Sequence, residues 1–237
     1  MVSPQTKVTA FVLHSRPYQD SSLLVDLLTA ELGLVRVVAK GARNKSKKNA
    51  LRCDPYTRLE VSLSGRSNLK TLCGSEVLFS SYRLQGERLF AAMYVNELIL
   101  RVLHEGDPLP EVVPLYESVI AKLAGADNLE LILRPFELQL LELLGYGIDF
   151  SADVDGNEIL LDKIYAYIPE YGFQLISDIQ KINNKFSGEQ ICNIKVGGLI
   201  DQSSRRDAKK LVRLALSPLV GAKPFMSREL FAGVQPK

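Results

Sequence analysis

The densest group of chemically active side chains is a run of positive charge between residues 32 and 53. This stretch contains no acidic residue, so its cations repel one another and folding alone gives no reason to gather them. The phosphates of a nucleic acid would relieve the repulsion and release condensed counterions. The candidate DNA contacts here are Arg36, Lys40, Arg43, Lys45, Lys47, Lys48 and Arg52. A solvated basic loop without a ligand is the alternative interpretation.

A second basic patch lies near the end of the chain. Arg206, Lys210 and Arg213 have the spacing i, i+4 and i+7 of one helical face, and Arg205 and Lys209 flank them. The opposite, apolar face consists of Ala208, Leu211, Val212 and Ala215. The cationic side fits DNA contact through Arg206, Lys209, Lys210 and Arg213, and it fits a solubilising surface equally well.

The first patch follows a module that we predict to be built of strands. Short segments rich in Val, Leu, Thr and aromatic residues alternate with turn signals, and the alternation is clearest at residues 58–63. The predicted strands are residues 7–16, 22–30, 34–40, 56–63 and 69–79. Five strands with a longer connection between the third and the fourth fit an OB-fold β-barrel, and an SH3-like barrel fits nearly as well.

From residue 85 the apolar spacing becomes helical. Helices are predicted at 84–103, 109–123 and 129–144, and another begins at a capping box from Ser204 to Asp207. The first of these should be largely buried except for one polar stripe of Glu97, Arg101 and Glu105. Pro135 should kink the third helix or start its second part.

Residues 146–180 are irregular, with a short β-ribbon predicted at 164–169 and 173–176. We therefore predict an α+β chain of two domains. Residues 1–80 form an OB-fold DNA-binding barrel, and residues 81–237 form a helical domain that includes the insertion at 146–180. Net charge is uneven, at +6 for residues 1–80, −9 for 81–160 and +5 for 161–237. Such asymmetry is expected where basic surfaces meet a polyanion.

Motifs of catalysis are missing from the sequence. There is no phosphate-binding GxxxxGK[ST] loop, no GxGxxG, no HExxH and no GxSxG, and the two histidines, His14 and His104, fall in different predicted domains. The cysteines Cys53, Cys73 and Cys192 are far apart and have no metal-ligand spacing. We predict a protein that is not an enzyme and that has no cofactor or metal. No apolar run is long enough to cross a membrane, which favours the cytoplasm.

Six separated blocks resemble the RecO family of DNA repair proteins, in the same order and with the same spacing. They are AFVLHSRP at 10–17, VVAKGAR at 37–43, YVNEL at 94–98, FEL at 136–138, LGYG at 144–147 and KPFMSREL at 223–230. The resemblance implies a nucleoid-associated recombination mediator that binds single- and double-stranded DNA and anneals complementary strands. With RecR it would help RecA to replace the single-strand-binding protein, and RecF is a further partner.

The resemblance also implies that the acidic C-terminal tail of single-strand-binding protein docks on the helical domain. Arg134 and Phe136 are the candidates for that contact, with Arg134 as a structural cation at a helix end as the alternative. Many members bind zinc through four cysteines after the LGYG block, but residues 146–180 here contain none. Aromatic packing must then hold the ribbon, through Tyr165, Tyr167, Tyr171 and Phe173. An OB-fold RNA-binding or translation-associated protein is the second functional hypothesis.

Overall fold

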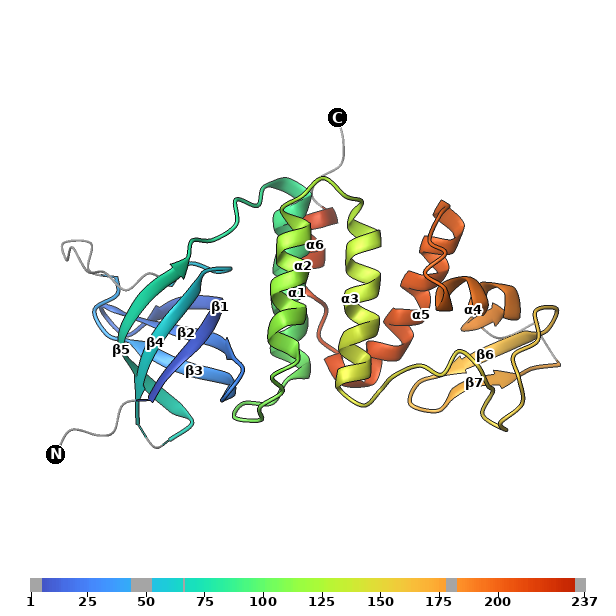
Figure 1. Ribbon diagram of the computed structural model, residues 1–237, viewed down its shortest axis with the longest axis horizontal. Coiled ribbons are helices and arrows are strands. Elements are labelled where there is room, and N and C mark those ends of the chain that lie inside the picture. Colours follow the sequence, from blue (N-terminus) through green and yellow to red (C-terminus); the bar gives the residue numbers. More distant parts are fainter. Residues whose placement is uncertain (1–5, 44–52, 66, 178–182, 233–237) are drawn as a thin grey trace. The chain divides into compact units, whose positions relative to one another are not determined.

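A computed structural model describes residues 6–43, 53–65, 67–177 and 183–232, and its ribbon is drawn in Figure 1. The chain divides into two compact units. The first comprises Met1–Gly125 together with Phe225–Lys237, and the second is Ala126–Pro224. The first unit contains helices as well as strands, and the predicted division into domains 1–80 and 81–237 stays a prediction.

A closed five-stranded barrel begins the first unit, with the strand order β1-β2-β3-β5-β4 (Figure 1). The strands are β1 (Thr6–Tyr18), β2 (Ser22–Thr29), β3 (Gly33–Ala39), β4 (Arg58–Ser64) and β5 (Leu69–Phe79). All neighbouring pairs are antiparallel except β3 and β5, which are parallel. The prediction of an OB-like barrel is confirmed, and the predicted strands differ from these by a few residues at their ends.

Alternation of side chains explains why these segments close into a barrel. In β4, Leu59, Val61 and Leu63 are buried while the residues between them are partly exposed. The buried set joins Val25 and Leu27 of β2 and residues of β1, β3 and β5 in one apolar core inside the barrel. β1 contains a bulge between Val12 and His14, which shifts the register of its pairing with β2.

Helices α1 (Gly86–Val102), α2 (Val112–Leu123) and α6 (Met226–Ala232) complete the first unit. α6 lies beside α1 (Figure 1) and is held there by Glu97 of α1. The Glu97 carboxylate accepts hydrogen bonds from the backbone N–H groups of Met226 and Ser227, each at 3.0 Å, and from the Ser227 hydroxyl at 2.8 Å. Burial raises the pKa of Glu97, but these bonds and one from Arg101 lower it below its ordinary value.

A buried hydrogen-bond chain joins the barrel to the helices of the same unit. The Asn96 amide donates to the backbone carbonyl of Leu13 at 2.6 Å, and the Tyr116 hydroxyl donates to the Asn96 side-chain oxygen at 2.9 Å. The loop after α1 also contacts β3, where the N–H of Gly106 donates to the carbonyl of Leu34. Gly33 has a φ of 65°, and a Cβ there would lie 2.2 Å from the carbonyl oxygen of Asp107. Glycine is therefore required at this contact.

The second unit combines a three-stranded sheet, of order β7-β6-β8, with helices α3, α4 and α5. Its elements are α3 (Leu129–Leu143), β6 (Ile164–Ile168), β7 (Gly172–Leu175), β8 (Lys185–Ser187), α4 (Gly188–Lys195) and α5 (Gln202–Val220). α5 contacts α3, α4 and β6. The residues predicted for its apolar face, from Ala208 to Ala215, are buried as expected.

Two local predictions are wrong, and one of the two alternatives for Pro135 is excluded. α5 begins at Gln202 rather than at Ser204, because the Asp201 carboxylate accepts the N–H of Ser204 at 2.7 Å and a carboxylate is favoured at a helix N-terminus. Pro135 starts no second helix, since α3 continues through it, and Leu131, whose carbonyl it leaves without a donor, is solvent-exposed. Tyr171 does not hold the ribbon, because it is 78% exposed while Tyr165, Tyr167 and Phe173 are buried.

Candidate nucleic-acid interface

The basic run after β3 is described in part. Lys45, Lys47, Lys48 and Arg52 lie outside the described residues. Arg43 is fixed on the turn between β1 and β2, where its guanidinium donates to the carbonyls of Gln19 and Asp20, each at 3.3 Å. Its own N–H donates to the carbonyl of Ser21 at 3.0 Å. Lys40 and Arg43 are both exposed, so their charges face solvent at this end of the barrel.

Arg36 has a different environment from Arg43. Its Nε lies 2.7 Å from Asp26 of β2, and its Nη1 lies 2.8 Å from Glu105. Burial raises the pKa of Asp26, but hydrogen bonds from His14 and Arg36 outweigh burial and lower that pKa below its ordinary value. Two carboxylates therefore neutralise Arg36 locally. The sequence places Glu105 in a helical stripe, whereas α1 ends at Val102 and Glu105 reaches the barrel instead.

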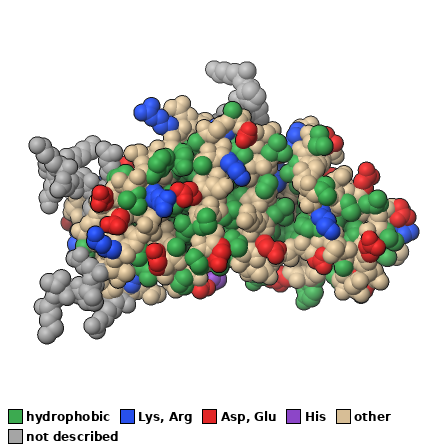
Figure 2. Space-filling view, viewed as in Figure 1, with side chains coloured by type: hydrophobic (Ala, Val, Ile, Leu, Met, Phe, Trp, Pro, Cys, Tyr) green, Lys and Arg blue, Asp and Glu red, His purple; other side chains and the backbone are tan. Residues whose placement is uncertain are grey.

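Other cations of the barrel strands also have carboxylate neighbours. Lys7 of β1 lies 3.1 Å from Glu60 of β4, and Arg58 of β4 lies 2.9 Å from Glu117 of α2. On the face of the barrel seen in Figure 2, Lys and Arg side chains stand among Asp and Glu side chains. Strand cations on this unit are therefore largely compensated, in contrast to Lys40 and Arg43.

Helix α5 brings the second predicted patch together in one groove of about 720 Å³. The groove runs between α5 and the residues that lead into β8. Its described lining contains four cations and no acidic residue, namely Arg206, Lys209, Lys210 and Arg213 with Asn183, Asn184 and Leu214. A concave surface lined by several cations attracts polyanions.

Lys210 anchors the middle of this groove. Its Nζ donates to the carbonyl of Lys185 at 2.8 Å and lies 4.4 Å from the centre of the Phe186 ring. Burial lowers the pKa of Lys210, which indicates that the groove is partly shielded from water. Lys209 lies 3.8 Å from Glu130 and Arg205 lies 3.4 Å from it, so these two cations also fasten α5 to α3.

Arg134 and Phe136, the candidates for a partner's tail, are both buried in α3. Arg134 makes an ion pair with Glu137 at 2.6 Å, an i, i+3 contact that the sequence could have suggested. Among the described residues, the Nε of Arg134 has no hydrogen-bond partner. Phe11 and Tyr56, two aromatic residues near the barrel, are buried as well.

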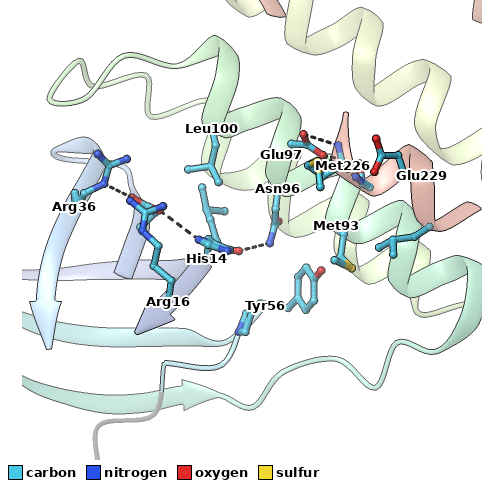
Figure 3. A pocket seen from close by; sticks show the side chains of 15 residues that line it. His14, Arg16, Arg36, Tyr56, Met93, Asn96, Glu97, Leu100, Met226 and Glu229 are labelled. Atoms are coloured by element: carbon cyan, nitrogen blue, oxygen red, sulfur yellow. Dashed lines mark hydrogen bonds and ion pairs between the residues drawn. The ribbon is translucent and has the colours of Figure 1, made fainter. Parts of the chain in front are cut away.

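Sequence patterns did not predict a pocket of about 620 Å³ in the first unit (Figure 3). Barrel residues line one wall and residues of α1 and α6 line the other, and most of the lining is apolar. Its polar wall on the barrel contains His14, Arg16, Asp26 and Arg36. Tyr56 enters it from the segment before β4, with a φ of 66° that bulky side chains rarely adopt.

Two searches of the described residues gave no site. No group of three or more His, Cys, Asp and Glu side chains is placed to hold a metal ion. Within the same ranges, no helix has both the length and the apolar character of a membrane span.

Comparison with known families decides what kind of protein has this architecture. The family model described as "Recombination protein O N terminal" matches residues 1–81, and that described as "Recombination protein O C terminal" matches residues 83–229. The chain belongs to the RecO family. The resemblance seen in six sequence blocks is thereby confirmed, and a role in DNA repair and recombination belongs to this family.

Curated RecO proteins match nearly the whole chain. "DNA repair protein RecO" of Enterobacter sp. (strain 638) is 42% identical over 230 residues, covering 96% of this chain and 97% of that protein. The protein of the same name from Haemophilus influenzae (strain PittGG) is 40% identical over 222 residues, covering 93% of each chain. That of Pseudoalteromonas atlantica is 40% identical over 227 residues, with 95% and 93% covered.

Proposed function

We propose that this RecO family member is a DNA-binding recombination mediator. It binds single- and double-stranded DNA, anneals complementary strands and, together with RecR, helps RecA to replace single-strand-binding protein on DNA. One observation supports this proposal most directly, namely the α5 groove, whose described lining holds four cations and no carboxylate. Such a surface binds phosphates irrespective of base sequence.

In this proposal DNA contacts both units. On the second unit it contacts Arg206, Lys209, Lys210 and Arg213. On the barrel it contacts Lys40 and Arg43 and the cations that follow them, Lys45, Lys47, Lys48 and Arg52. Arg36 lies at the edge of this surface, and its share of the binding is smaller because Asp26 and Glu105 already neutralise it.

Partner binding completes the proposal. The acidic tail of single-strand-binding protein docks at Arg134 and Phe136 of α3, where the Nε–H of Arg134 has no hydrogen-bond partner among the described residues. RecF and RecA act on the same DNA, in the nucleoid of the cytoplasm. The protein itself catalyses no covalent step and needs no cofactor or metal.

The decisive experiment measures annealing of complementary strands that are coated with single-strand-binding protein, with and without this chain. We expect the chain to accelerate annealing. A variant with charge reversal at Arg43, Lys45 and Lys48 should bind all DNA sequences more weakly, and its affinity should depend less on salt. Strand cleavage in the presence of magnesium, or strong preference for structured RNA over single-stranded DNA, would contradict the proposal.

A further inference from the structure

The pocket of the first unit is built around two irregularities of the backbone. The bulge in β1 directs the Leu13 carbonyl to Asn96, and Tyr56 is held at its positive φ by a hydrogen bond from its N–H to the carbonyl of Val12 at 2.9 Å. Both Leu13 and Tyr56 line the pocket. Bulges and left-handed non-glycine residues concentrate at functional sites, because they direct side chains where regular strands cannot.

Tyr56 brings an aromatic ring with a hydroxyl to the lining of this pocket. The residue is 6% exposed, and its ring extends from the barrel toward Met93 of α1 (Figure 3). Within the described residues its hydroxyl has no hydrogen-bond partner, and burial alone raises its pKa. A hydroxyl both donates and accepts hydrogen bonds, so at the pocket it can pair with a ligand that has a complementary polar edge.

The remaining walls suit a flat apolar group. Leu13, Met93, Leu100, Met226 and Leu230 contribute flexible or branched apolar side chains to the lining. Methionine adapts its shape to aromatic surfaces and interacts favourably with them. A volume of about 620 Å³ is within the range of pockets that hold small ligands.

Arg16 links the pocket, along the chain, to the turn that Arg43 contacts. Arg16, exposed on the pocket's barrel wall, is three residues from Gln19, whose carbonyl accepts a hydrogen bond from Arg43. Of the three carboxylates in the lining, Asp26 is neutralised by Arg36 and Glu97 is bound to Ser227 and Arg101, and the third is Glu229 of α6.

We propose that this pocket binds one unstacked base of single-stranded DNA, with the Tyr56 hydroxyl hydrogen-bonded to the edge of the base and Met93 packed on its face. Arg16 contacts the adjoining phosphate. The proposal rests on the proposed DNA binding and refines it. Holding a base outside the stack distinguishes single strands from duplex, where removing a base costs its pairing and stacking.

The experiment compares two single-stranded oligonucleotides with equal numbers of phosphates, one with bases and one made of abasic residues. The measured quantity is the ratio of their dissociation constants for the full-length chain. Wild type should bind the oligonucleotide with bases about tenfold or more tightly. Tyr56→Phe, which removes the hydroxyl alone, should reduce that ratio about three- to tenfold. Met93→Trp fills the pocket and should reduce it at least as much.

Tyr171→Phe is the matched control, because it removes the hydroxyl of an exposed tyrosine on the second unit. Its ratio should equal that of wild type. A single 2-aminopurine in the oligonucleotide gives a direct readout, since its fluorescence should change on binding to wild type and change less with Met93→Trp. Thermal unfolding of each variant establishes that the fold is retained.

The outcomes separate this inference from the proposed function. If wild type binds both oligonucleotides equally, or if Tyr56→Phe and Met93→Trp keep the full ratio, the base site is wrong while DNA binding stands. If neither oligonucleotide binds, the proposed function itself is wrong. If Met93→Trp keeps the ratio but abolishes binding of a peptide with the tail sequence of single-strand-binding protein, the pocket accepts a peptide and the inference is overturned.

Discussion

Cations on the strands of the barrel and cations on helix α5 have opposite surroundings. Arg36, Arg58 and Lys7 each lie within 3.1 Å of a carboxylate oxygen. In the α5 groove, Arg206 and Lys210 face asparagines, a carbonyl and an aromatic ring, and no carboxylate is in the described lining. Charge count along the sequence treats both groups alike, whereas the fold pairs these strand cations with carboxylates and gathers the α5 cations in a groove whose described lining has none.

Strand register explains the difference. Asp26 and Arg36 are direct partners in the antiparallel pair of β2 and β3, so the sheet places opposite charges side by side. On α5, every cation of the groove has an apolar or basic neighbour one turn away. Compensation in this sheet comes from a residue on the neighbouring strand, whereas on α5 Glu130 of α3 supplies the carboxylate near Arg205 and Lys209.

The largest loss of stability is expected where a cation that is paired with a carboxylate is buried. Glu137→Leu leaves Arg134 without its ion pair in α3 and should lower the free energy of unfolding by about 3–5 kcal/mol. Urea denaturation measures this loss. The double variant Arg134→Met with Glu137→Leu replaces both charges by apolar groups and should lose much less. Equal stability of the single and the double variant would mean that the pair does not contribute as we infer.

The next effect concerns binding. Arg206→Gln combined with Arg213→Gln should weaken binding to single-stranded DNA about tenfold to thirtyfold and lower the slope of log affinity against log salt by about two. The matched control is Arg205→Gln on the same helix, because Arg205 is bound to Glu130 and should leave the slope nearly unchanged. An equal change in both variants would remove the distinction between groove cations and structural cations.

Arg36→Gln tests the compensated cation of the barrel. It leaves the buried Asp26 with a weaker donor and should lower the free energy of unfolding by about 1–2 kcal/mol. Its salt slope for DNA should change less than that of Arg43→Gln, which in turn should keep the stability of wild type. Chemical denaturation and anisotropy titrations, run on both variants, give the two readouts.

The ion pair of Asp26 and Arg36 should also make the stability of the fold depend on pH in the acid range. The pKa of Asp26 is lowered in the folded state from its ordinary 3.8, so the unfolded chain binds this proton more readily. The stabilisation is therefore complete above 3.8 and is lost as pH falls from there through the folded pKa. Arg36→Gln should flatten this acid limb, and an unchanged limb would assign it to other carboxylates.

Local pattern predicted much of this architecture. Alternation in 58–63 and strand-forming composition in 69–79 predicted strands close to their observed bounds, and the apolar face of α5 is buried as its spacing required. Short elements escaped, because β8 has three residues and α4 and α6 have fewer than three turns each. The hydrogen bonds between Glu97 and Ser227 join residues 130 apart in sequence, and no local pattern indicates them.

The candidate site also has one part that local sequence pattern predicted and one part that it did not. Helical spacing was sufficient to place Arg206, Lys210 and Arg213 on one groove, because a helix fixes the geometry of its own face. The pocket around Tyr56 depends on a bulge, a positive φ and the return of α6 to α1, which are properties of the tertiary fold. Such sites can be found only after the chain is folded.

The smallest change in stability is expected where a cation and its carboxylate partner are both exposed to solvent. Lys7 and Glu60 are close, but their side chains are 70% and 41% exposed. Water screens such a pair and the ordering of two long side chains opposes it, so Lys7→Gln should change the free energy of unfolding by about 0.5 kcal/mol or less. Measured together with Arg36→Gln by denaturant unfolding, this variant shows whether a barrel cation stabilises the fold only when its ion pair is buried, or whenever a carboxylate is near. A loss as large as that of Arg36→Gln would show that proximity suffices.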